Sequence, residues 1–419
     1  MNPIAEIITI GDELLIGQTI DTNSAWIGEH LSLLGLPVRR IISISDNPEE
    51  IRLTLTDSLS RANLVLISGG LGPTNDDRTK TTLAQFFNSK LIENEDALED
   101  IKQIFKARNF PMTPINRAQA MVPDNCRVIR NFQGTAPGMW FEWEGRVVVS
   151  MPGVPYEMIG LMETSILPML AAHFRTPNIL HKTIMTTGVG ESKLASMLED
   201  WEKQLAENFS LAYLPSPGMV RLRISGTGAN REALEHDLNT LSDSLVDLIG
   251  EFHYGFDGVS LEEKVGELLT TGHFSVSTAE SCTGGHISSL ITRIPGSSKY
   301  YQGSIVAYAN EIKMKYLDVT DTMLKNHGAV SKEVVEQMAK SCRLHFGTDF
   351  SIATSGIAGP DGGTVTKPVG TTWIAIAGRN GVVSQCFQFG EHRERNVVKA
   401  ALAALNMLRI AILKETISL

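Results

Sequence analysis

The chain alternates short β-branched runs with helical patterns in two separate blocks. In the first block the strand-like runs are residues 6–10, 38–44, 63–70 and 146–153, separated by helical patterns such as 23–35 and 48–62. This alternation predicts βαβ units, in which helices cover a mainly parallel sheet. Residues 1–170 are therefore expected to form an α/β layered domain.

The same alternation returns in residues 256–419. There the strand-like runs are 274–279, 303–309, 349–355 and 370–378, with helical patterns at 261–272, from Ser331 onward and at the C-terminus. Residues 171–255 differ, since two helical patterns flank two short strands with a hairpin turn at "PSPG". We expect an α/β protein with two layered domains joined by a small α+β linking domain.

Composition agrees with a soluble, multidomain, cytoplasmic protein. A chain of 419 residues with 42% hydrophobic residues can bury several cores, roughly three at about 150 residues each. Its net charge of -10 argues against nucleic-acid binding, which needs concentrated Lys and Arg. The cysteines show neither metal-site nor disulfide spacing; they are Cys126, Cys282, Cys342 and Cys386. They are expected to be buried or free thiols in a reducing cytosol.

No membrane association is expected from either end of the chain. The N-terminus lacks a basic segment followed by a long apolar core, so it resembles a first strand rather than an export signal. The apolar stretch 396–415 is interrupted by Lys399, Asn406 and Arg409, which favours a packed helix over a membrane span.

The stretch "TAESCTGGH", residues 278–286, follows a predicted strand and contains two candidate nucleophiles, Ser281 and Cys282. Gly284 and Gly285 would let amides at the start of the next helix face an oxyanion or a phosphate. Alternatively, the glycines only form a tight turn and Ser281 only caps the helix. A cysteine at a helix start can have a lowered pKa, so the residues alone do not choose the nucleophile.

A serine needs a base, and no histidine in this half has a recognisable triad spacing. Lys313, in "YANEIK", could serve if burial left its amine neutral, although an exposed helical lysine is the plainer interpretation. A second glycine-rich turn, residues 353–364, could contact a phosphate or a ribose but fits no standard nucleotide motif.

The ordered motifs "TAESCTGG", "YANEIK", "HGAVS", "SGIAGPDGGT", "KPVGTTW" and "EHRERNV" closely resemble the C-terminal domain of the CinA family, the nicotinamide-nucleotide amidase of the PncC type. The resemblance implies metal-free hydrolysis of nicotinamide mononucleotide to nicotinate mononucleotide and ammonia. By motif position it implies the nucleophile Ser281, the base Lys313, the orienting Tyr308 and the cation Arg395. The implied substrate contacts are Thr283, Gly284, Gly285, Gly356 and Gly359.

In the N-terminal half, "LVLISGGLGPTNDDRT" predicts a buried strand that enters a glycine-rich loop ending in Asp76 and Asp77. Such a loop can bring a phosphate close to backbone amides while the carboxylates hold a divalent ion. The alternative is that one aspartate caps the helix that begins near Arg78.

The segments "GDELLIGQTIDTNS", "SGGLGPTNDDRT" and "MPGVPYEM" resemble the N-terminal domain of the same family, itself similar to molybdopterin-binding proteins. The resemblance implies metal-dependent (Mg, Mn or Co) cleavage of ADP-ribose into AMP and ribose 5-phosphate, and a homodimer. The candidate metal ligands are Asp12, Glu13, Asp46, Asp76 and Asp77. The candidate nucleotide contacts are Gly69, Gly70, Gly72 and Thr74.

Residues 171–255 resemble the KH-type linking domain of this family. The segment "SPGMVRL" is not the GxxG loop that clamps RNA, so RNA binding is not expected.

The favoured hypothesis is a bifunctional enzyme of pyridine-nucleotide salvage. One alternative is an amidase whose N-terminal half binds a nucleotide or pterin without turnover. The other is an interaction protein of competence or DNA damage, which the acidic composition does not favour.

Overall fold

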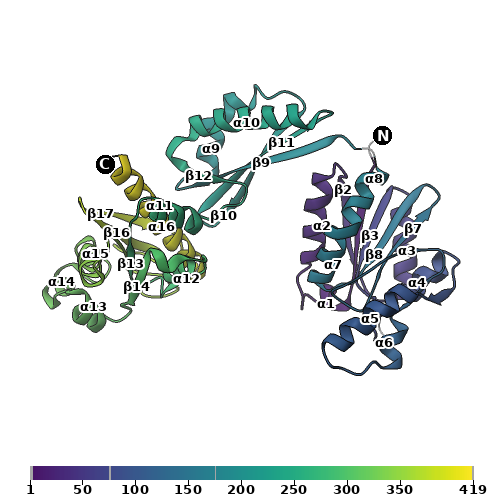
Figure 1. Cartoon of the computed structure of the whole chain (residues 1–419). Helices are drawn as coiled ribbons and strands as arrows, with labels where there is room; N and C mark the ends of the chain where they lie inside the picture. The colour runs from purple at the N-terminus through teal and green to yellow at the C-terminus, as the bar shows by residue number, and fades with distance from the viewer. Residues whose placement is uncertain (1–2, 75–76, 175, 418–419) are drawn as a thin grey trace. The chain divides into compact units, whose positions relative to one another are not determined.

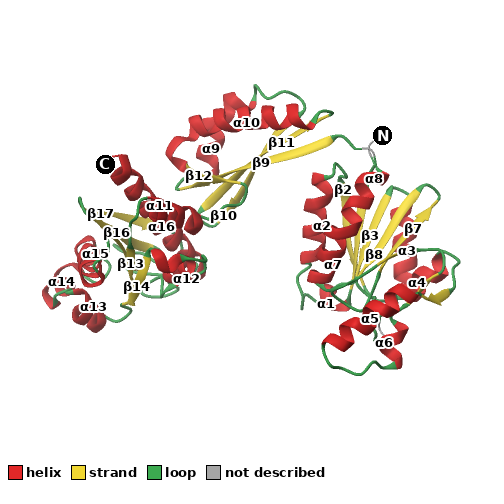
Figure 2. Ribbon diagram, in the orientation of Figure 1, coloured by secondary structure: helices red, strands yellow, loops and turns green. Residues whose placement is uncertain are grey.

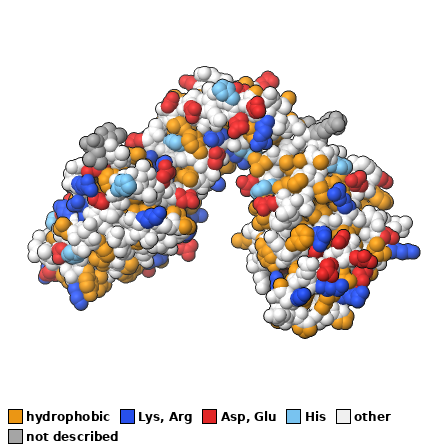
Figure 3. Space-filling view, in the orientation of Figure 1, with side chains coloured by type: hydrophobic (Ala, Val, Ile, Leu, Met, Phe, Trp, Pro, Cys, Tyr) orange, Lys and Arg blue, Asp and Glu red, His pale blue; other side chains and the backbone are white. Residues whose placement is uncertain are grey.

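The computed structural model describes residues 3–74, 77–174 and 176–417. The chain divides into two compact units, residues 1–180 with 227–234 and residues 181–226 with 235–419. Helices cover both faces of the sheet in each α/β domain (Figures 1 and 2). Among the described residues on the face shown in Figure 3, basic side chains stand between acidic ones rather than in one continuous patch.

The N-terminal domain is built on a six-stranded sheet with the order β2-β1-β3-β8-β7-β6. Its strands are β1 (Ala5–Ile10), β2 (Val38–Ile44), β3 (Leu64–Ser68), β6 (Arg127–Ile129), β7 (Gly138–Trp143) and β8 (Arg146–Met151). The four strands predicted from the sequence, β1, β2, β3 and β8, are parallel, while β7 and β6 add an antiparallel edge that the sequence had not indicated. The carboxyl ends of the four parallel strands consequently meet at one side of the sheet.

Two apolar cores lie on the opposite faces of this sheet. Alternation along β1 sends Ile7 to one core and Ile8 to the other, as a strand covered on both faces requires. The surrounding helices are α1 (Asp12–Leu15), α2 (Thr22–Leu33), α3 (Pro48–Leu59), α4 (Thr79–Phe86), α5 (Glu95–Ala107), α6 (Pro114–Ala118), α7 (Pro155–Leu161), the π-helical turn η1 (Met162–Ile166) and α8 (Leu167–His173). A separate hairpin pairs β4 (Leu91–Glu93) with β5 (Met121–Pro123).

The linking segment forms a four-stranded sheet with the order β10-β11-β9-β12. Its elements are β9 (Asn178–Thr187), α9 (Glu191–Glu202), β10 (Phe209–Ser216), β11 (Met219–Gly228), α10 (Arg231–Ile249), the 3-10 turn η2 (Gly250–Phe252) and β12 (His253–Phe256). The predicted hairpin turn is confirmed, since Ser216 pairs with Met219 and Gly218 has a φ of 81° between them. The sequence predicted two strands here, because β9 carries many polar residues and β12 is short.

The C-terminal domain has a five-stranded sheet with the order β14-β13-β15-β16-β17. Its strands are β13 (Val276–Glu280), β14 (Tyr301–Val306), β15 (Phe350–Gly356), β16 (Thr371–Gly378) and β17 (Gly381–Gln388). Its helices are α11 (Leu261–Thr271), α12 (His286–Thr292), the 3-10 turn η3 (Ser297–Lys299), α13 (Asn310–Leu317), α14 (Asp321–His327), α15 (Lys332–Phe346) and α16 (Arg393–Ile417). β13 is parallel to both of its neighbours, and β16 and β17 are antiparallel additions.

The two α/β layered domains and the KH-like domain between them therefore match the predicted fold class. Strand β17 was not predicted, since it is a half-exposed edge strand whose apolar residues only alternate.

Helix α16 is long and apolar enough to cross a membrane by length and composition. Its side chains Leu405 and Leu408 are fully buried in a core that also contains residues of α11, α12 and the sheet. A helix whose apolar face is covered in this way belongs to a domain core, as its interrupted sequence predicted.

Shortening a buried side chain of α16 should destabilise the unit that contains this helix. Leu405→Ala is expected to lower the free energy of unfolding by about 2–5 kcal/mol, because it leaves a cavity in a closed core. Leu413→Ala, at a position 37% exposed, is the matched control and should cost less than about 1 kcal/mol. Urea unfolding followed by circular dichroism measures both; equal effects would contradict the assignment of α16 to the core.

Candidate active sites

Three strand ends of the C-terminal domain meet at one place. Ser281 directly follows β13, Tyr308 lies just beyond β14, and Ser355 and Gly356 end β15. The three strands are parallel, so their carboxyl ends lie on the same side of the sheet. This is where ligands bind in open α/β sheets.

The buried carboxylate of Glu280 shapes the turn after β13. It accepts hydrogen bonds from the backbone N–H groups of Gly285 at 3.0 Å, Ile287 at 3.0 Å and Ser288 at 2.8 Å, and from the Ser288 hydroxyl at 2.6 Å. The hypothesis that amides at this helix start face a substrate anion is therefore wrong for these three residues. An internal carboxylate already satisfies them.

Ser281 does not cap helix α12. The N-cap is Gly285, which adopts a left-handed conformation with a φ of 94° and makes no side-chain cap. The backbone N–H of Ser281 donates to Thr354 O at 3.0 Å, which ties the turn to β15. Within the described residues, the amides of Cys282 and Thr283 have no backbone acceptor. They remain the turn's candidates for holding an oxyanion.

Ser281 and Lys313 line one small cavity of about 180 Å³. The other lining residues that carry polar or reactive side chains are Cys282, Tyr308, Asn310, Ser355 and Arg393. The structure thus brings together three of the four predicted catalytic residues. Gly356 also lines the cavity, as predicted.

Lys313 is almost completely buried, with 2% of its surface exposed. Its Nζ donates to the backbone carbonyls of Ala307 at 2.8 Å and Tyr308 at 3.1 Å. Burial lowers the pKa of Lys313 because the charged ammonium loses its hydration. The interpretation of Lys313 as an exposed helical lysine is therefore wrong.

Cys282 is a poor nucleophile in this structure. Its side chain is buried, and burial raises the pKa of the Cys282 thiol to about 12. A Cβ atom at Gly356 would lie 3.0 Å from the Cys282 sulfur, which shows how closely the backbone of β15 covers it. A thiol held neutral in this way lacks the thiolate that reacts.

The cation of this cavity is Arg393, and the predicted Arg395 is not among its lining residues. Arg393 Nη2 donates to the Tyr308 hydroxyl at 3.0 Å and Nη1 donates to the Gly359 carbonyl at 2.8 Å. Residues two apart on a helix point in different directions, so only one of the two arginines can face this cavity. The motif contains both arginines, and the sequence does not indicate which of them faces the cavity.

The remaining predicted substrate contacts are not among the described residues that line this cavity. Thr283 is buried, and its hydroxyl bonds to the Thr354 hydroxyl at 2.8 Å. Gly284 has a φ of 62° and is exposed, while Gly285 donates its amide to Glu280. Neither these three residues nor Gly359 are among the described residues that line the cavity. Asn310 and Ser355, which line the cavity, were not among the predicted residues, although both lie inside the motifs named above.

The N-terminal candidate site also lies at the carboxyl ends of parallel strands. Gly69 and Gly70, after β3, have φ values of 115° and 64°. A Cβ at Gly69 would collide with the Ile10 carbonyl, and one at Gly70 with the Thr79 hydroxyl. The predicted loop therefore needs glycine because β1, β3 and α4 approach it closely.

Acidic side chains crowd around this loop. Burial first, and then the negative charges of Asp12, Asp77 and Glu13, raise the pKa of Asp46 from 3.8 to about 6. Such mutual repulsion is what a bound cation relieves, so the charges of these side chains fit a divalent ion. No three acidic, histidine or cysteine side chains among the described residues already form a metal-binding group.

Asp77 organises the loop rather than the helix after it. Its carboxylate accepts the backbone N–H of Thr74 at 3.0 Å and also the Thr74 hydroxyl, and it fills the space beside Gly72. Helix α4 begins after Arg78 without a side-chain cap, so Asp77 is not its cap. The predicted ligand Asp76 lies outside the described residues.

Two buried polar atoms near this loop have no partner in the described part of the chain. They are Asn23 Oδ1 and Thr79 Oγ1. Asn23 Nδ2 donates to Ser68 Oγ at 2.9 Å and to the Gly153 carbonyl at 2.8 Å, which places the amide at the ends of β3 and β8. Buried polar atoms without partners are costly, and a bound polar ligand would satisfy them. Neither Asn23 nor Thr79 was among the residues predicted from the sequence.

Three family models match the chain in succession. A probable molybdopterin binding domain matches residues 6–172, a damage-inducible protein CinA KH domain matches residues 181–255, and a CinA C-terminal domain matches residues 259–412. Together they cover the three segments described above.

Curated relatives match over nearly the full length. A CinA-like protein of Cytophaga hutchinsonii is 47% identical over 97% of both chains, and one of Flavobacterium psychrophilum is 46% identical over 98% of this chain and 99% of its own. Among solved structures, the protein CinA from Thermoplasma acidophilum, described as of unknown function, is 38% identical, with a TM-score of 0.37 over 40% of this chain and 98% of its own.

Proposed function

Because the chain belongs to the CinA family, we propose that its C-terminal domain hydrolyses the amide of nicotinamide mononucleotide to give nicotinate mononucleotide and ammonia. The observation that carries the proposal is Lys313, a buried amine that lines the same small cavity as the Ser281 hydroxyl. A buried lysine in the same cavity as a serine can supply the base that the serine needs.

The hydrogen bonds of Lys313 suit this role. A neutral amine has two N–H bonds and one lone pair, and Lys313 Nζ has two carbonyl acceptors, Ala307 O and Tyr308 O. When both N–H groups donate there, the lone pair is left to accept a proton. In the proposed first step Ser281 Oγ attacks the carboxamide carbon and its proton passes to Lys313 Nζ.

Collapse of the tetrahedral intermediate breaks the C–N bond. The leaving nitrogen takes the proton from Lys313 and departs as ammonia, which leaves the acyl group on Ser281 Oγ. A water molecule then gives one proton to Lys313 as its oxygen attacks the ester carbon. The C–O bond to Ser281 breaks, Ser281 Oγ takes the proton back from Lys313, and the acid leaves and loses its remaining proton to solvent as the carboxylate. The amides of Cys282 and Thr283 are the proposed donors to the oxyanion in both steps.

The size of the cavity supports a proposal for how the nucleotide would lie. At about 180 Å³ it is smaller than the roughly 300–1,000 Å³ typical of ligand pockets, so it takes the ring and its carboxamide. The ribose and phosphate would extend toward the exposed Tyr308 and Arg393. A guanidinium beside a phenol hydroxyl there is suited to the phosphate.

Ser281→Ala should abolish release of ammonia from nicotinamide mononucleotide, with a fall in kcat of at least about a thousandfold, because the attacking oxygen is lost. Cys282→Ala, the adjacent control, should keep kcat within about threefold. Ammonia release measured with and without a chelator should be the same. A Cys282→Ala variant that loses activity while Ser281→Ala keeps it would overturn the proposal.

The pH dependence of kcat/KM tests whether Lys313 is the base. Only neutral Lys313 accepts a proton, and burial lowers its pKa below the ordinary value of 10.5. The value of kcat/KM should therefore rise with pH through an inflection below 10.5, and Lys313→Met should remove that limb. An unchanged profile in Lys313→Met would contradict the role of the lysine.

The two arginines of the same motif give a matched pair. Arg393→Ala should raise the KM for nicotinamide mononucleotide about tenfold, because a charged contact to the phosphate is lost. Arg395→Ala removes the same charge two residues away and should leave KM within about twofold. Steady-state kinetics of both variants decide between them; the reverse order would restore the assignment to Arg395.

A second function is favoured by the crowded carboxylates and the partnerless polar atoms of the N-terminal domain. We propose that this domain hydrolyses ADP-ribose to AMP and ribose 5-phosphate with a divalent metal ion. The ion would neutralise the pyrophosphate and activate water, and Asp12, Asp46 and Asp77 would hold it. Asn23 Oδ1 and Thr79 Oγ1 would take part in binding the nucleotide.

Formation of AMP from ADP-ribose should stop when a chelator is added and return with Mg²⁺, Mn²⁺ or Co²⁺. Asp46→Asn should lower the rate by about a hundredfold, since it removes a ligand from the crowded group. Asp57→Asn, an exposed surface position on α3 that is ion-paired with Arg61, is the control and should keep the rate. Binding of ADP-ribose without any AMP formation would instead favour a regulatory module.

A further inference from the structure

A second and larger cavity lies within the C-terminal unit, apart from the amidase site. It has a volume of about 830 Å³, and none of its lining residues lines the cavity with Ser281. Its walls come from the KH-like part, at the β10–β11 hairpin, the start of α9 and η2, and from β17 and α16 of the C-terminal domain. A cavity of this volume falls within the range of small-molecule sites.

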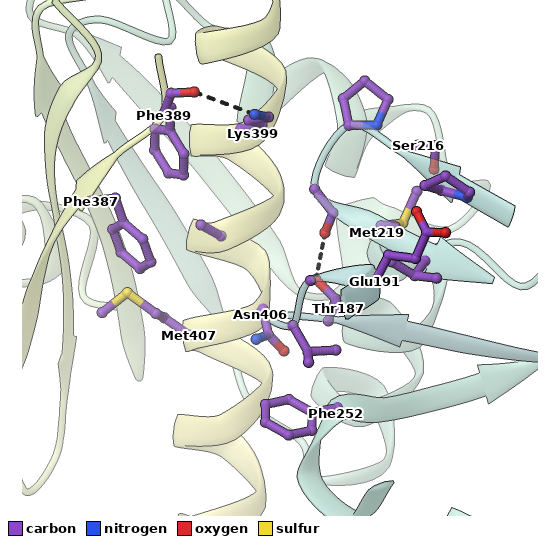
Figure 4. Close-up of a pocket in the computed structure, with 18 of the residues that line it drawn as sticks. Thr187, Glu191, Ser216, Met219, Phe252, Phe387, Phe389, Lys399, Asn406 and Met407 are labelled. Carbon is purple, nitrogen blue, oxygen red and sulfur yellow. Dashed lines mark hydrogen bonds between the residues drawn. The ribbon is translucent and has the colours of Figure 1, made fainter. Parts of the chain in front are cut away.

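One face of helix α16 forms the floor of this cavity. The lining positions are 395, 399, 403, 406, 407 and 410, which recur every three or four residues and so share one side of the helix. Figure 4 shows Lys399, Asn406 and Met407 along the helix, with Phe387 and Phe389 on one side in this view and Thr187, Glu191 and Met219 on the other. This face adjoins the core that contains Leu405, since Ala403 and Met407 both line the cavity and pack against that core.

The apolar part of the lining suits a planar ring. The Phe387 and Phe389 rings stack with centroids 5.3 Å apart and an interplanar angle of 9°. Phe252, Met219 and Met407 add an aromatic ring and two flexible thioethers. Aromatic side chains stack on planar rings, and flexible methionine side chains adapt to the shape of what they contact. Together they can bind heteroaromatic rings of different shapes.

The charged part of the lining suits an anion with hydroxyl groups. Arg395 and Lys399 lie one turn apart, and in the described residues the one hydrogen bond found for the Lys399 ammonium is a long one to the Phe389 carbonyl, at 3.3 Å. Neither cation has an ion-pair partner within the same described ranges. Glu191 and Glu251 of the KH-like part also line the cavity and can accept hydrogen bonds from sugar hydroxyls.

The cavity is connected to the amidase site through a short stretch of chain. Arg393, in the amidase cavity, and Arg395, in the second cavity, share the first turn of α16. Asn396 Nδ2 holds this turn to the carbonyls of Ala358 at 3.0 Å and Gly390 at 2.9 Å. A displacement of the first turn would therefore change the position of Arg393.

A second set of contacts runs through the backbone. Phe389 N donates to the Gly370 carbonyl at 3.1 Å, and Gly370 N donates to the Ile357 carbonyl at 2.7 Å. Ile357 is next to Gly356, which lines the amidase cavity. Both routes are continuous and made of hydrogen-bonded or covalently linked groups.

We propose that the second cavity is a regulatory site for a nucleoside monophosphate, whose ring packs on Phe387, Phe389 and the methionines and whose phosphate binds Arg395 and Lys399. Occupancy of the cavity changes turnover at the Ser281 site through the first turn of α16. The binding half of this inference is independent of the proposed function, and the coupling half rests on the amidase activity.

Binding is tested on the full chain with 2-azido-AMP as a photoaffinity probe, followed by peptide mapping. Label is expected within residues 215–220 or 385–410. Ala403→Trp, which fills the floor of the cavity, should remove that label, and Lys399→Glu should weaken AMP binding about tenfold by reversing a charge. Lys340→Glu, a charge reversal at an exposed position of α15 that lines neither cavity, is the control and should change nothing.

The outcomes separate clearly. Label found only before residue 181 or only in the amidase cavity overturns the site, and so does competition by inorganic phosphate as strong as that by AMP, since the ring would then contribute nothing. Unchanged label in Ala403→Trp also overturns it.

Coupling is measured as the effect of saturating AMP on kcat/KM for nicotinamide mononucleotide. A change of about fivefold or more in the wild type that is absent in Ala403→Trp supports coupling. Labelling without any change of rate overturns the coupling. A chain that labels as expected but releases no ammonia refutes the proposed amidase and leaves the binding site standing.

Discussion

The C-terminal site depends on one internal interaction, the burial of the Glu280 carboxylate against the start of α12. A fully buried carboxylate is stable only when hydrogen bonds replace its hydration, and Glu280 receives three from backbone amides and one from the Ser288 hydroxyl. These bonds fix the turn that contains Ser281 and Cys282. They also explain why a glycine pair follows, since Gly284 and Gly285 have positive φ values of 62° and 94°.

Both α/β domains place their candidate sites by the same topology. In each sheet the first strand, β1 or β13, lies between two parallel neighbours that continue in opposite directions along the sheet. The loops leaving the central and adjacent strands then diverge and leave a crevice at the carboxyl ends. The chemistry placed in the two crevices differs, because one collects carboxylates around Asp46 and the other buries an amine, Lys313.

Helix α16 serves three parts of the molecule at once. One face fills the core through Leu405 and Leu408, its first turn presents Arg393 to the amidase cavity, and a further face lines the larger cavity from Arg395 to Ile410. On a helix with 3.6 residues per turn these roles fall on adjoining positions, and Ala403 and Met407 both line the cavity and pack against the core. This geometry makes neighbouring residues of one motif, Arg393 and Arg395, belong to different sites.

The resemblance of the chain's motifs to the CinA family implied the grouping of Ser281, Tyr308 and Lys313. The sequence by itself determined the α/β class, the alternation of strands and helices, and the hairpin turn at Pro217 and Gly218. These follow from local periodicity, from turn residues and from the rule that parallel strands share their carboxyl ends. Only the tertiary structure decided that Lys313 is buried, that Glu280 occupies the helix-start amides and that Arg393 rather than Arg395 faces the cavity. The partners of Glu280 are close in the chain, but they meet its carboxylate only when Gly284 and Gly285 adopt positive φ values, which a residue pattern does not specify. The direction of Arg393 depends on Tyr308 and Gly359, which are distant in the chain, and the burial of Lys313 depends on how the domain packs around it.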